Sequence, residues 1–156
     1  MDHDDTIDQL NRLIDINKDA EAGFHSASES IKNSELETLF SGYARQHAKF
    51  AAEIQVEVER LGGSFSDSGT VGGALHRGWM DLKSALSGHS AAAILRSCEN
   101  GEESAEIAYT DVADTHPTGQ TLTLISKHRQ QIKEFLTRLA RLVAETKDGV
   151  DFQKNE

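Results

Sequence analysis

Apolar side chains recur every three or four residues along almost the whole chain, and no stretch shows sustained alternation of apolar and polar residues. A three-to-four period is that of an amphipathic helix, whereas a half-buried strand would alternate. The sequence contains a single proline, Pro117, so few helix breaks are imposed by proline. We therefore predict an all-α fold with long helices at residues 6–32, 35–61, 91–115 and 120–146.

Two of the connections between these helices are short and one is long. Residues 33–34 separate the first helix from the second, and residues 116–119 form a turn between the third and the fourth. The middle connection begins with a segment rich in Gly and Ser at 63–73, and residues 74–86, which include Trp79, predict a short helix. We expect an antiparallel four-helix bundle made of two helical hairpins joined by a long crossover.

The length of the chain favours a single domain. We place this domain at residues 1–147 and expect a frayed C-terminal tail at residues 148–156. Small polar or acidic residues before three of the helices predict N-caps at Asp5, Ser34 and Ser90.

Composition excludes several classes of partner. The formal net charge is −10, which argues against nucleic acid and against anionic membrane surfaces, because both attract basic proteins. The acidic N-terminus has no apolar core of the kind that a signal peptide needs, and no apolar run is long enough to cross a membrane. The single cysteine, Cys98, precludes an internal disulfide and fits a reducing compartment, so the cytoplasm is the expected location.

Four ionisable residues interrupt the apolar stripes of the predicted helices: Glu21, His47, Glu102 and His128. The same 26-residue spacing separates Glu21 from His47 and Glu102 from His128, and the two pairs are offset by 81 residues. Each of the four lies 13 residues from the turn of its hairpin, which corresponds to a depth of roughly 20 Å. We predict that all four side chains are buried at mid-bundle and that each Glu faces the His of its own hairpin.

Buried carboxylates and imidazoles are unfavourable unless they are paired. Two arrangements satisfy this requirement. In the first, the four residues hold one divalent metal ion, with iron, zinc and manganese as candidates. In the second, Glu–His hydrogen bonds fix the register of the helices and no metal is involved. Asn17, one turn from Glu21, is the expected hydrogen-bond partner of Glu21, and Glu53 and Glu57 are expected on the flank of the second helix.

The sequence also resembles a bacterial family of ferritin-like four-helix-bundle proteins of unassigned function. The resemblance extends over nearly the whole chain, and GALHRGWMDLKSAL is its most specific stretch. The other resembling stretches are DINKDAEAGF (15–24), QHAKFAAEIQVEVERLGG (46–63) and SCENGEESA (97–105). The resemblance implies the bundle fold, a bacterial source and a stress-related setting, and it implies no established activity. A homodimer is expected because ferritin-like bundles often dimerise.

The chain departs from the ferritin-like proteins that hold two irons. Those proteins carry Glu-x-x-His on the second and fourth helices. Here the positions three residues before His47 and His128 are occupied by Ala44 and Ile125, so both bridging carboxylates are missing. Di-iron oxidase or peroxidase chemistry is therefore not expected. Two functions remain open: a bundle that binds one metal ion, and a non-catalytic structural or protein-interaction domain.

Overall fold

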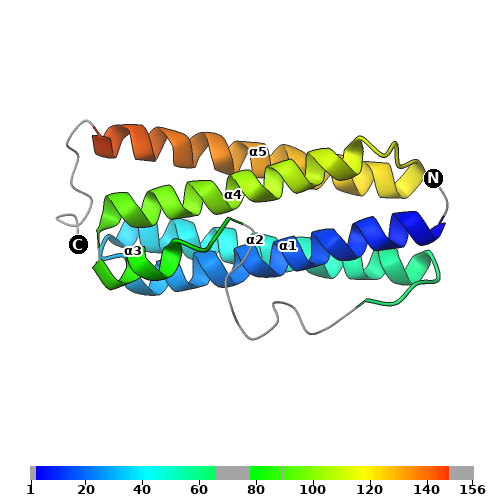
Figure 1. Cartoon of the computed structure of the whole chain (residues 1–156), viewed down its shortest axis with the longest axis horizontal. Helices are drawn as coiled ribbons and strands as arrows, with labels where there is room; N and C mark the ends of the chain where they lie inside the picture. The colour runs from blue at the N-terminus through cyan, green and yellow to red at the C-terminus, as the bar shows by residue number, and fades with distance from the viewer. Residues whose placement is uncertain (1–2, 66–77, 89, 148–156) are drawn as a thin grey trace.

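The computed structural model describes residues 3–65, 78–88 and 90–147, and within these ranges the chain forms helices and no strand. The all-α prediction is confirmed. Figure 1 shows the long helices side by side, each antiparallel to its neighbours, with a short helix near one end. The elements are α1 (His3–Ser30), α2 (Ser34–Arg60), α3 (Leu82–Gly88), α4 (Ala91–Ala113) and α5 (Gly119–Lys147). No helix in the described ranges combines the length and the apolar character that crossing a membrane requires.

The ends of the helices correct two of the predicted caps. Helix α1 begins at His3, so Asp5 lies inside the first turn. An acidic side chain there stabilises the helix through its attraction to the positive end of the helix dipole. Helix α2 is capped by Asn33, whose Oδ1 accepts a hydrogen bond from the backbone N–H of Leu36 at 3.0 Å, and not by Ser34. The prediction for Ser90 is confirmed, because its hydroxyl accepts a hydrogen bond from the N–H of Ala93.

The crossover helix starts later than predicted. Gly78 has a φ of +98°, a left-handed conformation that glycine adopts readily, and this prevents a continuous helix through residues 78–79. Trp79 therefore precedes α3 and is not part of it. Residues 66–77, which include most of the predicted Gly/Ser connection, and the predicted tail at 148–156 lie outside the described residues.

Trp79 anchors the crossover by packing between α1 and α4. Its ring is 1% exposed and meets the ring of Phe24 edge-on, at 4.9 Å between centroids. A methyl group at Gly23 on α1 or at Gly101 on α4 would overlap the indole. These two glycines therefore make the space that the tryptophan fills.

The apolar core consists of two clusters at opposite ends of the bundle. One surrounds Phe24, Phe40 and Trp79, and the other surrounds Leu13, Ile54 and residues of α4 and α5. The switch from one cluster to the other falls near Asn17, His47 and Glu102 on α1, α2 and α4. A layer of buried polar side chains thus separates two apolar halves.

We predict that Gly101→Ala destabilises the protein by about 1–3 kcal/mol, because the new methyl group overpacks the Trp79 site. Gly42→Ala is the matched control: Gly42 lies in α2, and a methyl group there would approach no atom of another helix, its nearest side-chain neighbour being an Arg45 nitrogen at 4.0 Å. That substitution should stabilise by about 0.5–1 kcal/mol, through helix propensity alone. Urea denaturation measures both effects, and equal stabilisation by the two alanines would refute the packing of Trp79.

A buried chain of hydrogen bonds as the candidate functional site

Six side chains from the four long helices form one continuous chain of hydrogen bonds through the bundle. Five of these six residues are completely buried, with 0% exposure, and the outermost, Glu53, has a side chain that is 29% exposed. In spatial order, the members are Glu102, His47, Asn17, Tyr109, His128 and Glu53. Every long helix contributes at least one of them, so the chain ties the whole bundle together.

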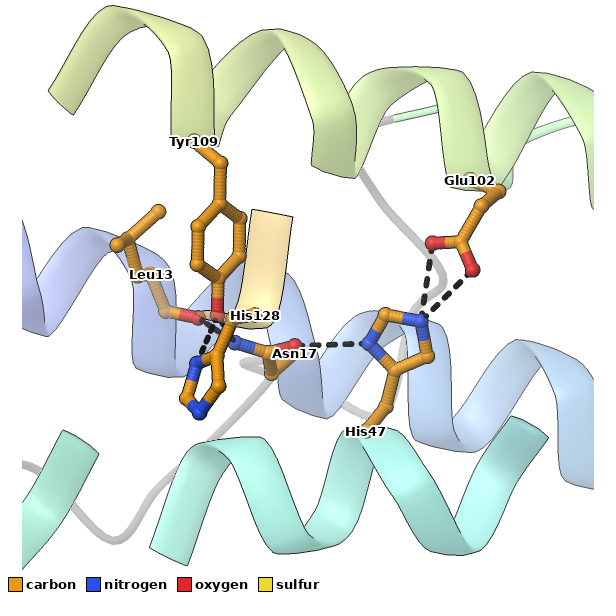
Figure 2. A network of polar contacts seen from close by, with 6 residues as sticks. All are labelled: Leu13, Asn17, His47, Glu102, Tyr109 and His128. Carbon is orange, nitrogen blue, oxygen red and sulfur yellow. Dashed lines mark hydrogen bonds and ion pairs between the residues drawn. The ribbon is translucent and has the colours of Figure 1, made fainter. Parts of the chain in front are cut away.

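The inner end of the chain is a His–Glu pair that joins α2 to α4. The Nε2 atom of His47 lies 2.9 Å from Oε1 and 3.0 Å from Oε2 of Glu102. On its other side, His47 Nδ1 lies 2.7 Å from Oδ1 of Asn17. Figure 2 shows the imidazole ring held between the carboxylate and the amide. Both ring nitrogens of His47 are therefore engaged by protein groups.

Asn17 passes the chain on to the opposite side of the bundle. Its Nδ2 atom donates to the backbone carbonyl of Leu13 at 2.9 Å and to the hydroxyl of Tyr109 at 2.8 Å. The Tyr109 hydroxyl lies 2.9 Å from His128 Nδ1 (Figure 2). His128 Nε2 in turn lies 2.8 Å from Oε1 of Glu53, where the chain reaches the surface.

The direction of each hydrogen bond follows from what each group can donate. The bond to the Leu13 carbonyl identifies the NH₂ end of Asn17, so Oδ1 faces His47 and must accept a hydrogen bond from Nδ1–H. The Tyr109 oxygen accepts from Asn17, which leaves its own proton to be donated to His128 Nδ1. His128 is then the tautomer with its proton on Nε2, and it donates to Glu53.

The electrostatics of the site agree with this assignment. Burial lowers the pKa of His128 to about 4, although the hydrogen bond to Glu53 and its negative charge act in the opposite direction. Burial also raises the pKa of the Tyr109 phenol above its ordinary value. Both groups are consequently neutral at pH 7, as the direction of the chain requires.

Aromatic rings enclose both imidazoles. Phe24 stacks on His47 at 5.8 Å between centroids, and Phe50 stacks on His128 at 4.2 Å. Phe50 also meets His47 edge-on at 5.5 Å. The rings keep water away from the hydrogen bonds, and a hydrogen bond is electrostatically stronger in such a low-dielectric environment.

The structure confirms part of the predicted burial of these residues and corrects their predicted pairing. His47, Glu102 and His128 are buried as predicted. The predicted pairings are wrong: Glu102 bonds His47 of the other hairpin, and His128 bonds Glu53. Glu21 is partly exposed and is not a member of the chain. Asn17, one turn earlier on α1, occupies the central position, where its amide bonds His47 through Oδ1 and Tyr109 through Nδ2.

Sequence reasoning missed Glu53 and Tyr109 as members of the site. Glu53 was expected on the flank of α2, where it does lie, but His128 on α5 faces that flank. Tyr109 falls on the apolar stripe of α4, and its hydroxyl was the available signal, since a buried hydroxyl needs a partner. Asn17 carried the same signal on α1.

A second buried carboxylate joins α2 to the start of α5. Glu57 is 6% exposed, accepts two hydrogen bonds from Arg60 at 2.7 and 2.8 Å, and accepts another from the Thr121 hydroxyl. The hydrogen bond from Arg60 is the main reason that the pKa of Glu57 is lowered. This residue was also expected on the flank of α2, and its hydrogen bond with Thr121 connects α2 to α5.

The geometry does not fit the metal centre of an iron-binding ferritin-like protein. All four ring nitrogens of His47 and His128 are engaged in hydrogen bonds with side chains. Ala44 and Ile125 are buried in the apolar clusters at the positions where bridging carboxylates would stand. In the part of the chain that the structure describes, no three His, Cys, Asp or Glu side chains are grouped so that they could hold a metal ion.

We predict that Tyr109→Phe destabilises the protein by about 2–3 kcal/mol, because Asn17 and His128 each lose a buried hydrogen-bond partner. Tyr43→Phe is the matched control: Tyr43 is also buried, but its hydroxyl makes no hydrogen bond within the described residues, so the change should be nearly neutral. Guanidinium unfolding curves measure the two free energies. If the Tyr109→Phe protein were as stable as the Tyr43→Phe protein, the two hydrogen bonds assigned to the Tyr109 hydroxyl would be contradicted.

Comparisons with known proteins agree with the fold. No curated protein matches the sequence. A solved structure, of the bacterioferritin-related dodecameric thioferritin from Bacteroides fragilis, superimposes with a TM-score of 0.61 over 93% of this chain and 92% of that one. At 15% identity, this similarity shows a ferritin-like fold and no more. A family model described as "Domain of unknown function (DUF2383)" matches residues 5–115, which is well over half of the chain. The chain has a ferritin-like fold and belongs to the DUF2383 family, whose function is unassigned.

Proposed function

We propose that this protein is a non-catalytic ferritin-like bundle in which the buried hydrogen-bond chain fixes the register of the four helices. The observation that supports this is that every member of the hydrogen-bond chain has a partner. From His47 to Glu53, each member donates to the next, and Glu102 pairs with the remaining nitrogen of His47. A buried polar network specifies one helix register when every member has a partner, because any slip leaves polar groups unpaired.

The same chain is poorly suited to catalysis. A hydrogen-bond chain relays protons only if every member can accept a proton at one atom and release one at another. The central member, Asn17, is an amide and does not do this near neutral pH. Access is restricted as well: Glu53 lines a surface cavity of about 660 Å³, while the other five members are completely buried. A substrate in that cavity would touch only one member of the hydrogen-bond chain, Glu53.

The competing proposal is that one iron, zinc or manganese ion binds at the buried His–Glu pair. A divalent ion would have to displace the proton between His47 Nε2 and Glu102, and it would find two protein ligands there. Glu21 and His128 would join it only after the helices had rotated. The non-catalytic proposal is favoured because it needs no such rearrangement.

Self-association is the further part of this proposal, with a homodimer as the simplest case. It is supported by two exposed apolar side chains, Val56 of α2 at 66% and Leu122 of α5 at 43% exposure. Each is adjacent in sequence to a member of the Glu57–Thr121 hydrogen bond, so both belong to the end of the bundle where α2 meets the start of α5. The structurally similar thioferritin is a dodecamer, and this supports assembly of a bundle with this fold.

Glu102 variants distinguish the structural proposal from the metal proposal. Glu102→Ala should cost about 2–4 kcal/mol, because it leaves a void and an unpartnered imidazole. Glu102→Gln should cost about 1 kcal/mol, because its NH₂ group can donate to His47 Nε2. Glu103→Gln is the control, since Glu103 is the exposed neighbour on the same helix, and it should be silent.

Thermal melts of these proteins are compared with a chelator and with added Zn²⁺, Mn²⁺ or Fe²⁺. We expect the melting temperature of the parent to be the same in every case. A ligand that binds only the folded state stabilises it by mass action. Stoichiometric metal that stabilises the parent and Glu103→Gln but not Glu102→Gln would therefore sink the structural proposal.

A further inference from the structure

The α2–α5 side is the most loosely packed of the four sides of the bundle. Two surface cavities open along it, one of which is the 660 Å³ cavity at Glu53. The other has a volume of about 550 Å³ and lies towards the end of α5, where its lining combines three cationic with three apolar or aromatic side chains. These six residues, which we call the basic groove, are Leu39, Tyr43, Lys133, Phe135, Arg138 and Arg141.

The cations of the basic groove have no anionic partner among the described residues. The ion pairs that the structure shows within the described residues lie elsewhere, as between Arg12 and Asp111 or between Arg60 and Glu57. Lys133, Arg138 and Arg141 make none within the described chain. One acidic residue, Glu134, also lines the cavity, so the groove has an excess of positive charge in a protein whose net charge is −10.

The floor of the groove is aromatic and carries one free hydrogen-bond donor. The rings of Tyr43 and Phe135 stack at 4.2 Å between centroids. The Tyr43 hydroxyl has no hydrogen-bond partner within the described residues. Burial raises the pKa of Tyr43 to about 12 while the nearby Arg138 charge opposes the rise, so the phenol is protonated and able to donate at neutral pH.

We propose that the basic groove binds a small amphiphilic carboxylate. Its head group would lie between the guanidinium groups of Arg138 and Arg141 and accept a hydrogen bond from the Tyr43 hydroxyl. Its apolar tail would cover Phe135 and Leu39. Guanidinium groups bind carboxylates with charge-assisted hydrogen bonds, and the cavity volume lies within the range of small-molecule sites.

Charge and size favour a small free anion over a larger one. A polyanion or an anionic membrane would face the net charge of −10 over most of the protein surface. A single carboxylate enters the cationic cavity and avoids that repulsion. An inorganic anion would use the cations but would leave the aromatic floor exposed, so the apolar tail should contribute to affinity.

Isothermal titration calorimetry of the full chain tests this, with octanoate kept below its micellar concentration as the probe. Octanol and inorganic phosphate are parallel probes that lack the head group and the tail, respectively. We expect saturable one-to-one binding of octanoate, at least tenfold weaker binding of octanol, and no binding of phosphate. Phosphate that binds as well as octanoate would identify an adventitious anion site, and absence of saturable octanoate binding would overturn the proposal.

Variants locate the site. Arg138→Gln and Arg141→Gln should each weaken octanoate binding about tenfold or more, and Tyr43→Phe should weaken it to a smaller degree. Arg96→Gln is the control, because Arg96 is an exposed arginine of α4 that does not line the groove. All of these side chains lack ion pairs within the described chain, so thermal melts should show unchanged folding.

Two results would count against the groove even if octanoate binds the parent. An equal loss of affinity in Arg96→Gln and Arg138→Gln would show that general surface charge is responsible. Co-sedimentation with vesicles of anionic phospholipid that depends on Arg138 would show that a membrane surface is the partner. We expect no co-sedimentation.

Discussion

The buried hydrogen-bond chain depends on the side-chain amide of Asn17, which connects its two halves. It accepts a hydrogen bond from His47 through Oδ1 and donates hydrogen bonds to the Leu13 carbonyl and to Tyr109 through Nδ2. A carboxylate or an aliphatic side chain at this position would leave buried groups unpaired on one side or both. Because an amide has distinct donor and acceptor ends, Asn17 also fixes the direction of every hydrogen bond from His47 to Glu53.

The rest of the bundle packs around the polar layer that contains Asn17. Apolar clusters fill the bundle on either side of the polar layer, and Phe24 and Phe50 shield the two imidazoles from water. The crossover is fixed nearby by Trp79, which occupies the space left by Gly23 and Gly101. The α2–α5 side is left with looser packing, and it is there that the chain reaches the surface at Glu53 and that both cavities of that side open.

The fold could be predicted because helical periodicity is a local signal that the long amphipathic helices repeat many times. Burial of His47, Glu102 and His128 followed from the same signal, since each interrupts an apolar stripe. Helix periodicity states which face of a helix is buried, but it does not state which neighbouring helix that face meets. The pairing of His47 with Glu102, across the two hairpins, depends on that second fact.

Glu53 and Glu21 are two further cases in which helix periodicity did not predict the environment of a side chain. Glu53 lies on the flank of α2 and joins the site because α5 presents His128 there, whereas Glu21 lies on the predicted stripe of α1 and is partly exposed. The position of Glu57 likewise depends on where α5 begins. Small rotations of a helix about its axis decide such cases, and they are set by packing between helices and not by local sequence.

The direction of the hydrogen bonds determines most directly which ring nitrogen of His128 carries the proton. Two-dimensional ¹⁵N–¹H correlation spectra of the imidazole rings, recorded between pH 7.5 and pH 4, report it. The account predicts that at pH 7 His128 carries its proton on Nε2 and His47 carries one on Nδ1, and that His128 gains a second proton only as the pH approaches its pKa of about 4. A His128 ring protonated on Nδ1 at neutral pH, or titrating near the ordinary histidine pKa of about 6.5, would contradict it.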